Sequence, residues 1–266
     1  MKKNRKPVRF TGQHFTIDHI LITDAINFID IRKHDTVLDI GAGKGFITTH
    51  LLARCNKIYA IENDQTLANF LKQKFGDNKC VEIIYRDFRN FNVPKVNFKV
   101  VANIPYCLTS KVLKYLMYVN MEYFAGASLI MQFEPAYKLT SKGGSDPLKL
   151  FYRTFYDFQI ICEIAPHSFA PPPTVKSALL GIIKKKNCSI GIEMKERYFR
   201  YLYFIFRNPS TNVLTVLKTI FRKSQARRII KKLYLQKNSK ISELSADKIA
   251  ACFQQMILVV PDRFQP

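Results

Sequence analysis

Residues 36–132 alternate short apolar runs with segments of helical periodicity, and this alternation restricts the fold more than any other feature. Strands are expected at 36–40, 58–61, 80–85, 98–102 and 128–132, and helices at 46–54, 64–75 and 109–118. Two further apolar runs, at 159–164 and 175–183, bring the expected strands to seven. Strands that alternate with helices form a parallel sheet with helices on both faces. The sequence therefore predicts an α/β fold.

The expected strand 98–102 ends in Asn103, Ile104, Pro105 and Tyr106. Pro105 cannot donate a backbone hydrogen bond, and it keeps the residue before it out of a helix, so the strand must stop here. Open α/β sheets bind ligands at the carboxyl ends of their strands. An amide and a phenol are thus expected at a ligand-binding edge. The alternative is a purely structural turn with Tyr106 in the core.

A glycine-rich turn, Asp39-Ile-Gly-Ala-Gly-Lys-Gly45, follows the first expected strand and opens a helix. Its small residues let a ligand approach the backbone at a helix N-terminus. A nucleoside triphosphate loop would need Ser or Thr where Gly45 stands, and a dinucleotide fingerprint would need glycine where Phe46 stands. S-adenosylmethionine has no pyrophosphate and accepts this tighter turn, so it is the favoured ligand. Asp39 is expected to brace the loop.

Two acids follow the next two expected strands, Glu62 after 58–61 and Asp87 after 80–85. Both should face the same crevice, where an acid at the end of the second strand can hold ribose hydroxyls. Asp87 can then accept a hydrogen bond from the exocyclic amine of an adenine. The alternative is that both acids are N-caps of the helices that follow.

Placed beside a methyl donor, the Asn103 side-chain oxygen and the Ile104 carbonyl can accept both N–H groups of an adenine amine. Such a site activates the nitrogen by orientation and electrostatics, without a titrating base. Tyr106 offers a face on which the base can stack. The residues thus favour a base-modifying enzyme that uses S-adenosylmethionine.

The charge of the chain points to a polyanionic partner. The 266 residues include 42 Lys and Arg against 20 Asp and Glu, a net charge of +22. Residues 184–237 contribute 15 of these cations and only two acids, with helical periodicity. We predict two domains, 1–183 with a basic arm at 1–9, and 184–266, a basic helical domain for RNA. Within it Arg222, Lys223, Arg227 and Arg228 are the expected phosphate contacts, the alternative being a solvated helix face.

Other features of the sequence set limits. The six cysteines are scattered singly, so neither a disulfide framework nor a zinc site is expected, and no metal is predicted. No apolar run approaches the roughly 18 residues of a membrane span, so we expect a cytoplasmic protein without a membrane partner. Residues 9–16 form a polar and aromatic patch before a helix that Asp18 can cap, with Ile20, Leu21, Ala25, Ile26 and Ile29 on its apolar face.

These motifs together resemble those of a known family. The tetrad 103–106, the turn 39–45, the patch Gln13-His14-Phe15 and the loop from Phe169 to Val175 with Lys176 and Ser177 are similar to those of the rRNA adenine N6-methyltransferases. Within that superfamily the chain most resembles the Erm group of 23S rRNA methyltransferases, particularly its Bacteroides-type branch. The likeness covers nearly the whole chain.

The resemblance implies a seven-stranded Rossmann-like methyltransferase domain that uses S-adenosylmethionine, with a small all-helical C-terminal domain. It implies dimethylation of one adenine in the peptidyl transferase loop of 23S rRNA, and resistance to macrolides, lincosamides and streptogramin B. A monomer acting on naked or precursor rRNA is expected. The rival functions are a housekeeping dimethyltransferase of small-subunit (16S) rRNA and a catalytically silent nucleic-acid-binding relative.

The resemblance also implies roles for individual residues. Gln13, His14, Phe15 and Thr16 would surround the methionine end of the cofactor, with Gly41 beneath it, Glu62 on its ribose and Asp87 on its adenine. Asn103 would lie between the cofactor and the target amine, and Tyr106 and Phe169 would sandwich the target base. His14 departs from the family, which usually has Asn there, although an imidazole can also donate a hydrogen bond.

Overall fold

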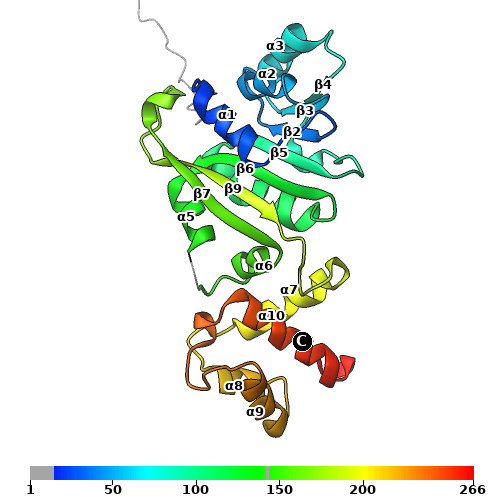
Figure 1. Ribbon diagram of the computed structural model, residues 1–266, viewed down its shortest axis with the longest axis vertical. Helices are drawn as coiled ribbons and strands as arrows, with labels where there is room; N and C mark the ends of the chain where they lie inside the picture. Colours follow the sequence, from blue (N-terminus) through cyan, green and yellow to red (C-terminus); the bar gives the residue numbers. More distant parts are fainter. Residues whose placement is uncertain (1–14, 142–143) are drawn as a thin grey trace, which may run out of the picture. The chain divides into compact units, whose positions relative to one another are not determined.

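The computed structural model describes residues 15–141 and 144–266. Its main feature is a seven-stranded sheet with the strand order β4-β3-β2-β5-β6-β9-β7 (Figure 1). The strands are β2 (Thr36–Ile40), β3 (Lys57–Glu62), β4 (Val81–Tyr85), β5 (Phe98–Asn103), β6 (Phe124–Gln132), β7 (Tyr156–Ile164) and β9 (Ser177–Lys184). The five strands from β4 to β6 pair in parallel. The predicted α/β class and all seven predicted strands are confirmed.

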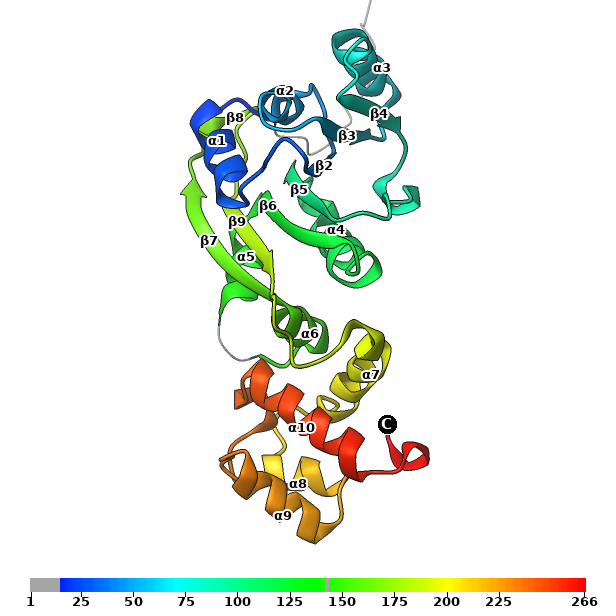
Figure 2. The same ribbon diagram turned by 45° about the vertical axis from the view of Figure 1, so that its right-hand side comes forward.

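Helices cover the sheet, as the alternating pattern predicted. They are α1 (His19–Phe28), α2 (Phe46–Leu52), α3 (Gln65–Phe75), α4 (Thr109–Lys114), which continues as a π-helical turn over Tyr115–Val119, and α5 (Phe133–Thr140). Figure 2 shows α1 and α4 on opposite sides of β5 and β6. Buried residues of α1 and α2, such as Ile22 and Leu51, share a core with Val37 of β2 and Val101 of β5. Strands β2 and β5 pair in parallel, so their carboxyl ends lie side by side.

Helix α1 begins where Asp18 was expected to cap it. Asp18 Oδ1 accepts hydrogen bonds from the amides of Ile20 and Leu21 at 3.0 and 3.1 Å. These bonds, with one from the Ser168 hydroxyl, lower the pKa of the Asp18 carboxyl. The predicted apolar face is wrong at one position, because Ile20 is 76% exposed and Ile22 is buried in its place. Ile22, Ala25, Ile26 and Ile29 follow the i, i+3, i+4, i+7 spacing of one helix face, and Ile20 lies on the opposite side.

A second, two-stranded sheet joins the N-terminal end of the described chain to a distant segment. Strand β1 (Phe15–Thr16) pairs antiparallel with β8 (Phe169–Ala170), with Thr16 opposite Phe169. This pairing was not predicted from the sequence.

The chain divides into two compact units, the first formed by residues up to Tyr137 with Gln159–Ile182, the second by Lys138–Phe158 with Ile183–Pro266. The predicted boundary at 183/184 lies beside this division. However, the predicted first domain also included 138–158, which the structure groups with the second unit. The reason is aromatic packing: Phe151 and Phe155 contact Tyr198, whose hydroxyl lies 2.9 Å from Thr154 Oγ1.

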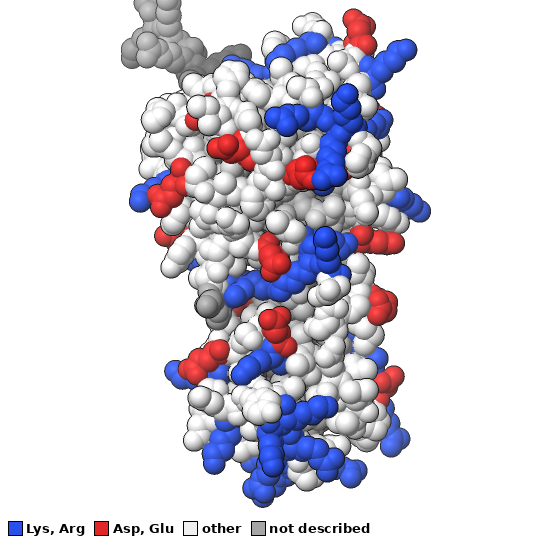
Figure 3. Space-filling model, in the orientation of Figure 1, with Lys and Arg blue, Asp and Glu red and all other residues white. Residues whose placement is uncertain are grey.

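The second unit is helical, as predicted for its C-terminal part. Its helices are α6 (Pro147–Phe155), α7 (Lys195–Ile205), α8 (Val213–Lys218), α9 (Lys223–Lys232) and α10 (Ala246–Val259). Tyr198 and Tyr201 of α7 stack edge-on against Phe253 of α10 in its core. Lys and Arg side chains gather over α8 and α9 (Figure 3).

Candidate active site

Three glycines shape the turn between β2 and α2. Gly41, Gly43 and Gly45 have φ angles of 75°, 56° and 72°, a left-handed conformation that glycine adopts at little cost. The amides of Gly41 and Ala42 both donate to the carbonyl of Ile61 in β3. A Cβ atom on Gly41 would lie 3.6 Å from Cδ of Pro105. The turn therefore runs directly beside the end of β5.

Glu62 ends β3 with a side chain that is only 4% exposed. Its Oε2 accepts a 2.9 Å hydrogen bond from the Gly43 amide, and its Oε1 accepts from the amides of Asn63 and Asp64 at 2.8 and 2.9 Å. These bonds fix the carboxylate against the glycine turn. Each carboxylate oxygen has two acceptor positions, so Oε2 keeps capacity for a ligand hydroxyl.

Asp87 follows β4 and forms a close ion pair with Arg89. It also accepts a 2.9 Å bond from the Arg89 amide, which makes it the N-cap of the short helix Phe88–Asn90. The hydrogen bonds from Arg89, followed by its charge, hold the pKa of the Asp87 carboxyl below its ordinary value. The helix-cap alternative is thus realised for Asp87, and the residue still lines the cavity described below.

The tetrad after β5 has the predicted form. The strand ends at Asn103, and the Ile104 amide donates 2.9 Å to the carbonyl of Ile130 in β6. Pro105 then caps a short helix, Tyr106–Leu108. The Tyr106 hydroxyl lies 2.6 Å from Oγ of Ser177, and burial raises the pKa of the phenol.

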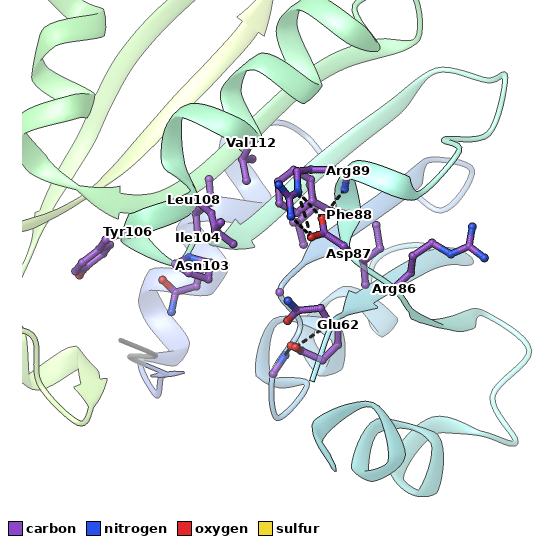
Figure 4. A pocket seen from close by; sticks show the side chains of 16 residues that line it. Glu62, Arg86, Asp87, Phe88, Arg89, Asn103, Ile104, Tyr106, Leu108 and Val112 are labelled. Carbon is purple, nitrogen blue, oxygen red and sulfur yellow. Dashed lines mark hydrogen bonds and ion pairs between the residues drawn. The ribbon is translucent and has the colours of Figure 1, made fainter. Parts of the chain in front are cut away.

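These residues meet around one cavity of about 160 Å³. Its walls include Gly41, Gly43, Glu62, Asp87, Asn103 and Tyr106. Asn103 and Tyr106 lie on one side of it, and Glu62 and Asp87 on the other (Figure 4). The structure therefore brings together, at one sheet edge, the glycine turn, both acids and the tetrad.

Of the other predicted site residues, Thr16 and Phe169 do not line this cavity. Gln13 and His14, and the side chain of Phe15, lie outside the described residues. Thr16 is buried, with Oγ1 3.4 Å from the Ser168 carbonyl. Phe169 is 3% exposed and packs in the core with Ile22 and Leu179, so it does not share the cavity wall with Tyr106.

Asp39 is buried beneath the glycine turn. Its Oδ2 accepts a 2.7 Å bond from the Thr48 hydroxyl, while Oδ1 has no hydrogen-bond partner among the described residues. Burial raises the pKa of this carboxyl to about 7, and the nearby Glu62 adds to the effect. Asp39 thus joins β2 to α2 from below, in line with a bracing role.

Several residues of the cavity wall were not predicted from the sequence. Phe88, Arg89, Leu108 and Val112 line it but were not singled out. The available signal was position, because Phe88 and Arg89 directly follow Asp87, and Leu108 and Val112 follow the tetrad at helical spacing. Phe88, Leu108 and Val112 are the apolar residues of this group, and an apolar wall suits a planar ring.

Four cations on α9 were predicted to hold phosphates. Arg222, Lys223, Arg227 and Arg228, which we call the α9 basic surface, are all exposed. The opposite side of the helix is buried through Ala226 and Ile229. None of the four forms an ion pair with an acid in the described parts of the chain. The positive charge is therefore not neutralised internally.

Two features are absent from residues 15–141 and 144–266. No helix there is long and apolar enough to cross a bilayer. No group of three or more His, Cys, Asp or Glu side chains there is arranged to hold a metal ion.

The strand order, the glycine turn, the buried Glu62 and the cavity before Asn103 define the class of S-adenosylmethionine-dependent methyltransferases. Comparison with known proteins narrows this class. The family model for ribosomal RNA adenine dimethylase matches residues 3–257. The chain therefore belongs to the ribosomal RNA adenine dimethylase family, and it is an rRNA adenine N6-methyltransferase that uses S-adenosylmethionine.

Individual proteins agree with this assignment. An rRNA adenine N-6-methyltransferase of Bacteroides fragilis is 49% identical over 266 residues, all of both chains. The crystal structure of the 23S rRNA methyltransferase ErmE has a TM-score of 0.79 at 20% identity, over 91% of this chain and 99% of that one. A dimethyladenosine transferase from Plasmodium falciparum has a TM-score of 0.76 at 20% identity, over 92% and 98%. The two crystal structures share the fold.

Proposed function

We propose that this enzyme dimethylates N6 of a single adenine in the peptidyl transferase loop of 23S rRNA, and thereby confers resistance to macrolides, lincosamides and streptogramin B. The main support for methyl transfer at this site is that the carboxyl ends of β2 and β5 lie close together. Asn103 at the end of β5 lies beside the glycine turn after β2, where a Cβ on Gly41 would be 3.9 Å from the Asn103 carbonyl oxygen. A methyl donor on the turn and an amine at Asn103 would thus be neighbours.

The residues present fit S-adenosylmethionine. The glycine turn offers a wall without side chains, and Glu62 is held rigidly with acceptor capacity left for ribose hydroxyls. Asp87 stands on the same cavity wall for an adenine amine. We assign Gly41, Glu62, Asp87 and Asn103 to the cofactor, and keep Gln13, His14, Phe15 and Thr16 as proposed neighbours of its methionine end. The cofactor supplies an electrophilic methyl group on its sulfonium sulfur.

The chain's own groups orient the nucleophile. An adenine amine is a poor nucleophile because its lone pair is delocalised into the ring. The Asn103 side-chain oxygen and the Ile104 carbonyl accept its two N–H groups and favour a pyramidal nitrogen with a directed lone pair. Tyr106, held through Ser177, presents a face for stacking on the base.

Phe169 is the proposed second face of this base sandwich. Its ring lies in the core with Ile22 and Leu179, so stacking requires β8 and the following loop to rearrange when RNA binds. The target base must itself be unstacked, since an adenine amine inside a duplex cannot reach such a site. Unpaired loop nucleotides meet this condition most easily.

The α9 basic surface is the proposed phosphate contact. Its exposed cations attract any RNA, while base recognition at the active site selects the nucleotide. We further propose that the enzyme acts as a monomer in the cytoplasm on naked or precursor rRNA.

One test compares the proposed target with the housekeeping alternative. Purified enzyme with labelled S-adenosylmethionine is given naked 23S rRNA or assembled small ribosomal subunits. We expect label in 23S rRNA alone. Label in small subunits alone means a housekeeping 16S rRNA dimethyltransferase, and label in neither RNA contradicts the proposed 23S rRNA target.

A further inference from the structure

Tyr234, the second residue after α9, has an unusual conformation for its size. Its side chain is 87% exposed, and its φ angle is +50°. In the described chain, the other residue that is not glycine and has positive φ is Asp30, whose short polar side chain tolerates this region better. Tyr234 therefore combines a solvent-exposed aromatic ring with a backbone conformation that is unfavourable for an aromatic residue.

The turn around Tyr234 is well anchored. The Tyr234 amide donates 3.3 Å to the Lys231 carbonyl, and the Leu235 amide donates 2.9 Å to the Ile230 carbonyl. Leu235 is buried, and Lys248 Nζ donates to the Tyr234 carbonyl at 3.2 Å. Glycine is the usual residue at the left-handed position that ends a helix in this way. The end of the helix thus explains the left-handed backbone conformation at position 234, but it does not explain why the residue is a tyrosine.

The surroundings of the ring are strongly cationic. Residues 222–240 contain eight Lys and Arg and no Asp or Glu. Lys231 and Lys232 in the last turn of α9 and Lys237 just beyond it are exposed. Lys232 bonds to the neutral Gln255. The positive charge of the α9 basic surface therefore extends along the chain to Tyr234, and residues 222–240 contain no acid that could neutralise it.

We propose that Tyr234 stacks on an unpaired base of the rRNA whose phosphates lie along the α9 basic surface. This inference rests on the proposed RNA binding of that surface. Cations beside an exposed aromatic ring are the combination by which proteins hold single-stranded nucleic acid, with phosphates on the cations and a base on the ring. Every base has a π face, so this contact positions the RNA and does not select a sequence.

The Tyr234→Gly variant distinguishes a role in base stacking from a structural role. Tyr234→Gly removes the ring and relaxes the backbone, so its thermal midpoint should be no lower than that of the parent protein. Its affinity for an RNA hairpin with an unpaired loop should fall about tenfold, within the range of one lost base stack. Affinity for a fully paired duplex of equal length should change little, because its bases are already stacked.

The salt dependence of binding provides a second readout. Tyr234→Gly should leave the slope of log affinity against log salt unchanged, because no phosphate contact is lost. Tyr234→Phe should bind the hairpin like the parent protein, and Leu258→Ala, which truncates another highly exposed apolar side chain of the second unit, serves as the control.

Normal hairpin binding by Tyr234→Gly overturns the stacking proposal, as does an equal loss in Tyr234→Phe. Replacement of all four residues of the α9 basic surface in the same assay keeps the two proposals apart. If that variant loses affinity while Tyr234→Gly does not, the phosphate contact stands and the stack is refuted. If neither loses affinity, the RNA-binding role of α9 itself is refuted.

Discussion

The backbone amide of Gly43 donates a 2.9 Å hydrogen bond to Oε2 of Glu62, so one buried carboxylate ties the glycine turn to the end of β3. The same side chain accepts from the two amides that follow it. The residue proposed to hold the ribose therefore also shapes the loop on which the cofactor would lie. The proposed ribose contact and the local fold would thus depend on the same side chain.

Glu62→Gln tests this coupling. The amide of Gln replaces one acceptor oxygen with a donor, which leaves at least one backbone N–H without its partner. We expect the free energy of unfolding to fall by about 1–3 kcal/mol, together with weaker S-adenosylmethionine binding. Chemical denaturation and calorimetric titration measure the two effects. Glu82→Gln is the control, because Glu82 forms an exposed ion pair with Lys57 that contributes little. Unchanged cofactor affinity in Glu62→Gln would remove Glu62 from the ribose.

Alanine at two glycines of the turn should have different effects. A Cβ at Gly45 would lie 2.5 Å from Cε2 of Phe75 and 2.8 Å from Cδ2 of Leu71, whereas at Gly41 the nearest atom is 3.6 Å away. Gly45→Ala therefore adds overpacking, about 1–3 kcal/mol, to backbone strain. Gly41→Ala suffers the strain alone and should chiefly weaken cofactor binding. Equal loss of thermal stability in both variants would contradict this distinction.

The buried Asp39 should make stability depend on pH. Its folded pKa of about 7 lies above the ordinary value of 3.8 for an aspartate. Such a group stabilises the folded state below the unfolded pKa, and this contribution is lost as pH rises toward the folded pKa. Between about pH 4 and 7 the parent protein should lose up to about 1.4 kcal/mol per pH unit relative to Asp39→Asn. Urea unfolding of both proteins across this range measures the difference, and parallel pH profiles would show that Asp39 is not the titrating group.

Tyr106 offers a test of the stacking face. Tyr106→Phe keeps the ring and loses the hydrogen bond to Ser177, so methyl transfer should fall only modestly. Tyr106→Ala removes the face, and the KM for RNA should rise by a factor that corresponds to about 1–3 kcal/mol. Steady-state kinetics with a short rRNA fragment separates them. Ser177→Ala should resemble Tyr106→Phe, and equal effects of Phe and Ala at position 106 would exclude a stacking role.

Neutralising the α9 basic surface should weaken RNA binding and reduce its salt dependence. Each lost phosphate contact should lower the slope of log affinity against log salt by about 0.7–0.9. Replacement of Arg222, Lys223, Arg227 and Arg228 with Gln keeps long polar side chains on the helix. Filter binding at several salt concentrations gives the slope, and an unchanged slope would mean that these cations do not contact phosphates.

The sheet was predictable because its strands carry local signals. The runs that became β2 and β5 end in Gly41 and Pro105, residues that stop strands for reasons of backbone geometry. Helices α5 and α6 were missed. For α6 the aromatic residues around Phe151 are compatible with a helix or a strand, and their packing against Tyr198 decides between the two. The same packing explains why the sequence did not reveal that residues 138–158 lie in the second unit.

The sequence predicted which residues meet at the candidate active site, but not the contacts that each side chain makes. Parallel strands end at one edge, so Glu62, Asp87 and Asn103 had to be near one another once the strands were identified. The ion pair between Asp87 and Arg89 depends on side-chain conformation, which spacing does not determine. The burial of Phe169 depends on the pairing of β8 with β1, a contact between residues about 150 positions apart in sequence. Such long-range pairing leaves no periodic signal.

The most direct test of the proposed reaction is primer extension on 23S rRNA from cells that express the parent protein or Asn103→Ala. Dimethylation at N6 removes the hydrogen-bond donors of adenine, so reverse transcriptase should stop at one adenine in the peptidyl transferase loop. We expect this stop with the parent protein, and its absence with Asn103→Ala, whose purified form should still bind RNA because only the acceptor of the amine is lost. Full-length extension with the parent protein, or a stop that persists in Asn103→Ala, would contradict the assignment of the target and of Asn103.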